Sequence, residues 1–312
     1  IIGINAMTIA VASAAGPGIA GAILAVAPWH WLFAVNIPLG IVVLASGAAL
    51  ARTEGAPRRL DGKAVAANTL MFVLFFLGAD RVAQDPLSGG LLIAGSAACL
   101  IGLMRIERRS ATPLVPTDLF ADAAFRSSVI ASVCCFTGQM LGLVALPFYL
   151  QHKLGMTATE AGLYMMPWPA AVALIAPISG RLADRGKTAW LCAAGGALLA
   201  IGLATIGLLP ADPRGVAFVV GTVIAGLGFG LFQTPNNRIL LLSAPQARSG
   251  AAGAMQGTAR LTGQTLGAIA MAVIFGVVPL ASAPEVALVL AAAFAGLAAF
   301  VSLGRARHEV VG

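Results

Sequence analysis

Residues 10–40 read AVASAAGPGIAGAILAVAPWHWLFAVNIPLG, and this stretch decides the fold. Gly16-Pro17-Gly18 lies in the middle of an apolar run, where proline removes a backbone donor and glycine removes side-chain bulk. Such a helix can kink and pack closely against a neighbour, and lipid tolerates it only where other protein covers the freed backbone groups. Trp29 and Trp31 then indicate a membrane surface. The stretch therefore predicts two membrane-spanning helices inside a larger bundle.

The composition excludes an ordinary soluble domain. Of the 312 residues, 59% are hydrophobic and 10% are charged, whereas soluble domains carry about 25% charged residues. The formal net charge of +7 does not indicate nucleic-acid binding, because the basic residues fall in short connections between apolar runs. The four cysteines lie inside apolar runs without Cys-x-x-Cys spacing, and the three histidines fall at helix ends or in the tail. We therefore predict an integral membrane protein without a metal site or cofactor.

Ten apolar runs are long enough to cross a membrane, which takes about 20 mainly apolar residues. The predicted fold is thus an all-α polytopic membrane helix bundle. The expected spans cover residues 3–27, 31–51, 63–80, 87–105, 126–150, 159–180, 188–209, 215–242, 250–280 and 284–304. The chain begins Ile-Ile-Gly, without Met and already inside an apolar run, so we expect a fragment rather than a signal peptide, whose basic segment is missing.

The basic residues are distributed unequally between alternate connections. Fourteen fall in one set: Arg52, Arg58, Arg59, Lys63, Arg105, Arg108, Arg109, Arg126, Arg181, Arg185, Lys187, Arg248, Arg305 and Arg307. The opposite set holds three, Arg81, Lys153 and Arg214. Because short cytoplasmic loops carry the excess of Lys and Arg, this asymmetry predicts that both ends of the chain are cytoplasmic.

Several motifs carry a family resemblance. Residues 16–21, GPGIAG, resemble the antiporter motif Gly-Pro-x-x-Gly-Gly of helix five in major facilitator superfamily exporters, with Ala20 where glycine is usual. Residues 29–40 resemble the start of helix six in the fourteen-span drug:proton antiporter branch (EmrB/QacA type), and residues 226–237, GLGFGLFQTPNN, are close to another motif of that branch. The chain is identified on these motifs as a member of that branch lacking roughly the first four helices.

The resemblance also implies a division of the chain. Residues 1–51 would hold the last two helices of an amino-terminal lobe, with Gly16, Pro17, Gly18 and Gly21 forming the antiporter-motif kink. Two extra inter-lobe helices would follow at 52–109 and a cytoplasmic connector at 110–125, where residues 113–120 are similar to the family's connector. A six-helix carboxy-terminal lobe would cover 126–304, and a cytoplasmic tail 305–312.

One loop is similar to the superfamily signature Gly-x-Leu-Ala-Asp-Arg. Its candidate gating residues are Gly180, Arg181, Asp184, Arg185 and Lys187. The usual residue between Arg185 and the following glycine is missing. A carboxylate at a helix boundary can accept backbone donors or pair with a cation, which would fix one conformation of the cytoplasmic face. The alternative is a solvated turn that merely follows the positive-inside rule.

The ninth predicted span, 250–280, is the most polar. At 100° per residue, its glycines share one sector about 120° wide with amide and guanidinium groups. The sector contains Gly253, Gln256, Gly257, Arg260, Gly263, Gln264 and Gly267. A charge inside a span costs about 2.5 kcal/mol or more at the centre, so we expect Arg260 to face protein or water. It is either a cavity-lining residue or an anchor near the cytoplasmic surface.

Other polar side chains are also candidates for lining a cavity. Gln233, Asn236 and Asn237 lie in the eighth span, at a depth comparable with Gln256 and Arg260 if the two spans run antiparallel. A shared polar cluster is therefore expected. Gln139 in the fifth span is either a cavity residue or an interhelical hydrogen-bond donor.

The resemblance implies a secondary active transporter of the bacterial inner membrane rather than an enzyme. It would export small amphiphilic or cationic toxic compounds in exchange for protons by alternating access within the lipid bilayer. Because no Asp or Glu lies deep in a span, the proton-coupling carboxylate is expected in the missing helices. Two alternatives remain: the same fold exporting a metabolite or lipid precursor, and an incomplete membrane protein that transports nothing. A periplasmic adaptor is an open question.

Overall fold

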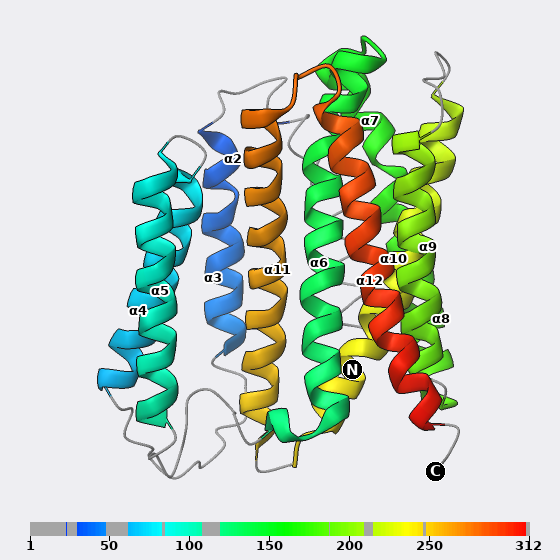
Figure 1. The fold of residues 1–312 in the computed structure, drawn as a ribbon. Helices are drawn as coiled ribbons and strands as arrows, with labels where there is room; N and C mark the ends of the chain where they lie inside the picture. The colour runs from blue at the N-terminus through cyan, green and yellow to red at the C-terminus, as the bar shows by residue number, and fades with distance from the viewer. Residues whose placement is uncertain are drawn as a thin grey trace.

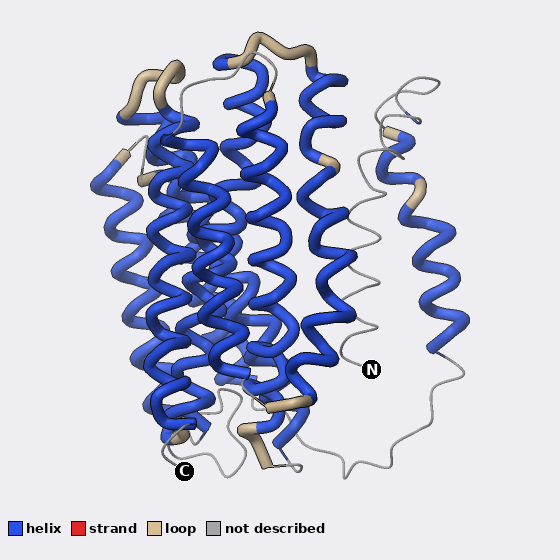
Figure 2. Tube along the Cα trace, turned by 90° about the vertical axis from the view of Figure 1, so that its right-hand side faces the viewer, coloured by secondary structure: helices blue, strands red, loops and turns tan. Residues whose placement is uncertain are grey.

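A computed structural model describes residues 23, 30–47, 62–82, 85–107, 119–186, 188–208, 215–245 and 248–309. Within these ranges the secondary structure is helical and no strand occurs, which confirms the predicted all-α class (Figure 1). In both views the helices run nearly parallel or antiparallel to one another (Figure 1, Figure 2). The antiporter-motif residues Gly16, Pro17, Gly18 and Gly21 lie outside the described residues.

The described elements follow the predicted spans in order. They are α2 (Trp31–Ala34), α3 (Asn36–Gly47), α4 (Gly62–Arg81), α5 (Pro86–Glu107), η1 (Leu119–Ala121), α6 (Ala123–Phe148), η2 (Tyr149–Lys153), α7 (Ala158–Met165), α8 (Pro167–Asp184), α9 (Thr188–Leu208), α10 (Val216–Leu242), α11 (Ser249–Val277) and α12 (Ala283–Glu309). Among the described residues, seven helical stretches are long and apolar enough to cross a membrane, and residues 36–46 and 65–78 form shorter apolar helices. The expected span 3–27 falls outside the described part.

The sixth span consists of two helices. Thr157 and Glu160 form a capping box at the start of α7: the Glu160 backbone N–H donates to Thr157 Oγ1 at 3.3 Å, and the Thr157 N–H donates to Glu160 Oε2 at 2.8 Å. α7 ends at Met165, directly before Met166 and Pro167. Since proline has no N–H to donate to the preceding turn, it begins a new helix more readily than it continues an old one.

The bundle core is formed by α6, α9, α10 and α12, with α8 packed on α10 and α11 packed on α6. Small residues let the backbones come close. A Cβ built on Gly195 of α9 would lie 2.7 Å from the carbonyl oxygen of Gly228 on α10, and one on Gly138 of α6 would lie 2.6 Å from the carbonyl oxygen of Ala291 on α12. These positions leave room for hydrogen only, which explains the glycines in helices that otherwise favour larger residues.

The two ends of the bundle differ in charge. The connections after α5, α8 and α10 and the end of α12 lie at the bottom of Figure 1, which we call the basic end. The described basic residues there include Lys63, Arg105, Arg126, Arg181, Arg185, Arg238, Arg248 and Arg305. The alternation expected from the sequence is therefore present, and the assignment of the basic end to the cytoplasm stays a prediction.

Candidate functional site

An ion pair joins α8 to α10 at the basic end. Asp184, the last residue of α8, accepts from Arg238 Nη1 of α10. The Asp184 side chain is 67% exposed and that of Arg238 is 32% exposed. The pair is open to water, so it contributes no more than about 1 kcal/mol to stability. It nevertheless links the end of α8 to α10 across 54 positions of the chain.

The other members of the predicted gating loop do not share this contact. Gly180 is half-buried, whereas Arg181 and Arg185 are exposed at the end of α8. Gly186 follows with φ of +90°, a conformation that favours glycine and turns the chain away from the helix. Lys187 lies outside the described residues. The sequence left open whether Asp184 accepts backbone donors or pairs with a cation, and it could not identify Arg238, which lies 54 positions away.

A buried arginine network ties together α6, α10 and α12. It consists of Arg305, Ser302, Asn236, Ser128 and Ser132. Arg305 Nη1 donates to Asn236 Oδ1 at 3.0 Å and to Ser128 Oγ, and Nη2 donates to Ser302 Oγ at 2.9 Å. Asn236 Nδ2 donates in turn to Ser132 Oγ at 2.7 Å and to the Ser128 carbonyl at 3.2 Å. Arg305 is 8% exposed and Asn236 1%, so these bonds hold without competition from water.

The network bears on two predictions. Residues 305–312 were expected to form a cytoplasmic tail after the last span; the structure continues α12 to Glu309, and Arg305 is buried. A guanidinium can enter the bundle because its donors find acceptors on two neighbouring helices. Asn236 was expected to join Gln256 and Arg260 in one cluster, but it bonds to α6 and α12 instead. Ser128 and Ser132 are four residues apart and therefore lie on one face of a helix. This spacing was the signal in the sequence for a polar contact on α6.

The predicted polar face of α11 divides into two parts. Gly263 and Gly267 pack on α6, where a Cβ would lie 2.6 Å from the carbonyl oxygens of Val133 and Thr137 respectively. Gly253 and Gly257 have no heavy atom within 4 Å of such a Cβ among the described residues. The first half of α11 therefore leaves open space at its two glycines, although Ala252 and Ala259 on the same half are buried against Phe125, Val129 and Leu240.

Three polar side chains of α11 have no polar partner within the described part of the chain. Gln256, Arg260 and Gln264 are half-buried and form no side-chain hydrogen bond there, and Arg260 Nε is itself buried. Gln233 and Asn237 of α10 are likewise half-buried without such bonds in the ranges described. These groups can donate to and accept from a ligand or water without first breaking a bond within the bundle.

Gln139 is a separate case in the middle of α6. Its side chain is 7% exposed, and its buried Oε1 has no hydrogen-bond partner in the described structure. The neighbouring Gly138 packs on α12. A role for Gln139 in lining a cavity remains a prediction.

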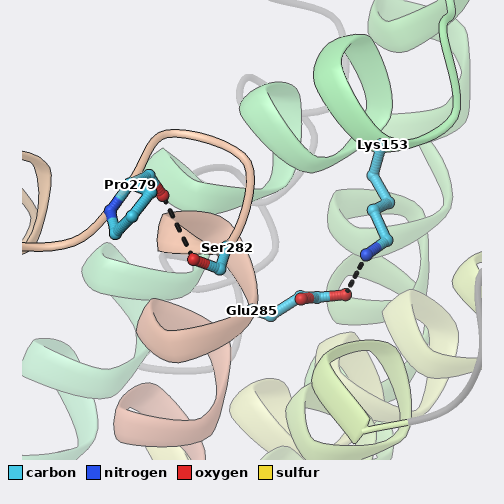
Figure 3. Close-up of polar contacts among 4 residues, drawn as sticks. All are labelled: Lys153, Pro279, Ser282 and Glu285. Carbon is cyan, nitrogen blue, oxygen red and sulfur yellow. Dashed lines mark hydrogen bonds and ion pairs between the residues drawn. The ribbon is translucent and has the colours of Figure 1, made fainter.

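At the opposite end, Lys153 and Glu285 connect η2 to the start of α12. Lys153 Nζ lies 2.8 Å from Glu285 Oε1, and Figure 3 shows the two side chains pointing toward each other. Ser282 Oγ donates to the Pro279 carbonyl at 3.2 Å in the adjacent turn. The side chains of Lys153 and Glu285 are 38% and 30% exposed. This pair and the Asp184–Arg238 pair both join elements of the six-span bundle that runs from α6 to α12.

Comparisons with known proteins place this geometry in context. The chain matches the Major Facilitator Superfamily over residues 1–268. It is 40% identical over 311 residues to the uncharacterized transporter YebQ of Escherichia coli (strain K12), which covers 96% of this chain and 67% of that protein.

Two further relatives have names that say what they transport. The riboflavin transporter RibZ of Clostridioides difficile (strain 630) is 29% identical over 85% of this chain and 58% of its own length. The multidrug efflux pump LfrA of Mycolicibacterium smegmatis is 29% identical over 84% of this chain and 53% of its own length. The chain thus spans between about half and two thirds of the relatives it matches.

Proposed function

Because the chain belongs to the major facilitator superfamily, we propose that its protein exports small amphiphilic or cationic toxic compounds in exchange for protons. The membrane would be the bacterial inner membrane, with the basic end in the cytoplasm. The similarity to LfrA supports drug export, and the motifs at residues 16–21 and 226–237 support the fourteen-span antiporter branch.

The observation that carries this proposal is the free polar surface of α11. Arg260 lies within a membrane-spanning helix and has a buried Nε without a hydrogen-bond partner in the described structure. A charged group inside a span is costly, so such residues usually face a protein interior or a water-filled cavity. We infer that Gln256, Arg260 and Gln264 face the transport pathway, where a passing substrate or water completes their hydrogen bonds.

We also assign a gating role to the ion pair between Asp184 and Arg238. In alternating access, helices at one end separate while those at the other end close. A weak, exposed pair suits such a contact, because it can break and form again at a cost of about 1 kcal/mol or less. The pair would stabilise one arrangement of α8 relative to α10 without preventing the other.

The experiment is efflux from cells and vesicles that contain the full-length protein. Everted vesicles with an imposed pH gradient should move a cationic dye such as ethidium, and dissipating the gradient should stop the movement. Arg260→Ala should abolish transport at unchanged protein level. Dye movement that is independent of both the gradient and Arg260 would contradict the proposal.

A second candidate cargo is a metabolite, favoured by one observation. RibZ, a riboflavin transporter, is as similar to the chain as LfrA is, at 29% identity. The same vesicles should therefore be tested with radiolabelled riboflavin. Gradient-driven riboflavin movement without dye movement would replace the drug-export proposal by this second one.

A further inference from the structure

A groove of about 670 Å³ opens between α6 and α12 at the basic end. Asp122 and Arg126 from the start of α6 line it, together with Ile130 one turn deeper. Ile239 of α10 and Val301 and Arg305 of α12 form its remaining walls. The groove therefore lies where the first turns of a membrane span meet the membrane surface.

An exposed cation lies at the mouth of the groove. Arg126 is exposed, and its Nη1 donates to the Phe120 carbonyl, a neutral acceptor, at 2.9 Å. No carboxylate among the described residues forms an ion pair with it. Asp122 is the nearest acid in the lining, and its Oδ1 is engaged as the cap of α6, accepting from the Phe125 N–H at 2.7 Å. The Arg305 guanidinium is engaged in the buried arginine network, so Arg126 is the cation that the mouth of the groove presents.

The deeper part of the groove is apolar. Ile130 follows Arg126 by four residues on the same face of α6, and its side chain is 46% exposed. Val301 and Ile239 continue this surface on α12 and α10. A cation at the surface with an apolar wall one turn deeper is complementary to a molecule that carries an anionic head and a hydrocarbon chain.

We propose that this groove binds one anionic phospholipid. The free N–H groups of Arg126 donate to the phosphate, since guanidinium and phosphate form strong charge-assisted hydrogen bonds. One acyl chain packs along Ile130, which would otherwise expose its side chain beside a charged mouth. Basic pockets between membrane helices recognise anionic headgroups in this way. This lipid is separate from any transported substrate, so the inference does not depend on the proposed cargo.

Lipid retention by the full-length protein tests the proposal. The protein is released from nanodiscs of equal parts phosphatidylglycerol and phosphatidylcholine with identical acyl chains, and bound lipids are counted by native mass spectrometry. The wild type should retain phosphatidylglycerol preferentially. Arg126→Gln should lower this preference by about fivefold, the effect of one basic side chain at a membrane surface.

Matched controls separate the groove from general surface charge. Arg105→Gln removes an exposed arginine from the same end of the bundle but outside the groove, and the preference should stay unchanged. Ile130→Trp should reduce retention by filling the groove, whereas Ile201→Trp, at an isoleucine of α9 that is 54% exposed, should not.

Two results would overturn the proposal. The first is an equal loss of preference in Arg126→Gln and Arg105→Gln, which would indicate a diffuse surface effect. The second is displacement of the lipid by millimolar inorganic phosphate, which would indicate a site for the free anion rather than for a phospholipid.

Discussion

Arg305 donates a hydrogen bond to Asn236 Oδ1 at 3.0 Å, although 69 positions separate the two residues in the chain. The amide of Asn236 is thereby used on both sides, since its Nδ2 donates to Ser132 Oγ. Each of the two side chains supplies a hydrogen-bond partner that the other needs, because both are buried. One asparagine thus holds three helices in register at the basic end.

We predict that Asn236→Ala destabilises the protein by about 2–4 kcal/mol. In this buried site the substitution removes the oxygen that accepts from Arg305 and the N–H that donates to the Ser132 hydroxyl. Thermal unfolding in detergent measures the effect. Asn237→Ala is the matched control, since Asn237 is half-buried and forms no side-chain hydrogen bond in the described structure, and it should change stability by less than about 0.5 kcal/mol. Equal effects of the two variants would contradict the assigned role of the network.

Asp184→Asn and Arg238→Gln should each change stability by no more than about 1 kcal/mol, because the ion pair is exposed. Each should nevertheless slow transport if the pair stabilises one conformation of the basic end. The exchange Asp184→Arg with Arg238→Asp should recover part of the lost rate. The double variant Asp184→Asn with Arg238→Gln completes a double-mutant cycle of efflux rates, in which additive losses would show that the two residues act independently.

Arg260→Lys should lower the efflux rate by about tenfold or more, because lysine cannot reproduce the planar, forked donors of a guanidinium. Arg260→Ala should lower it at least as far. Rates must be normalised to the amount of protein in the membrane. If Arg260 only anchors α11 near the surface, the lysine variant should keep the wild-type rate, since lysine can also extend to the interface.

Gly195→Ala should disrupt the contact between α9 and α10, because the added methyl would lie 2.7 Å from the carbonyl oxygen of Gly228. We expect a loss of about 1–3 kcal/mol from overpacking. Gly90→Ala in α5 meets no heavy atom within 4 Å in the described structure and should gain up to about 1 kcal/mol from higher helix propensity. Thermal unfolding should therefore show a lower stability for Gly195→Ala and a higher stability for Gly90→Ala than for the wild type.

Hydrophobic runs predicted the helices well, and the reason is that a span is a local property of the chain. Pro177 and Pro235 lie inside α8 and α10 without ending them, as neighbouring helices in a bundle allow, whereas α6 ends one residue after Pro147 and continues as η2. Which helices become neighbours is not local. The partners of Asp184 and Asn236 lie more than fifty positions away, and no sequence period indicates them.

Arg305 shows why part of the candidate site was missed. A count of basic residues treats each arginine after a span as solvated, and the apolar run ends at residue 304. The structure instead continues α12 and gives the guanidinium acceptors on α6, α10 and its own helix. Conversely, the polar face of α11 was recognised from its period, although its glycines turned out to divide between a packed half and an open half.

The contrast between α11 and α12 sets how this bundle can deform. Both helices pack on α6, but α12 is attached to it by directional bonds from Arg305, whereas α11 rests on it through Gly263 and Gly267 with no side-chain hydrogen bond between the two helices among the described residues. Directional bonds thus join α6 to α10 and α12, whereas van der Waals packing at Gly263, Gly267, Ala252 and Ala259 joins α11 to its neighbours. A shift of α11 against α6 would break no side-chain hydrogen bond between these two helices among the described residues, as shear motions between packed helices require.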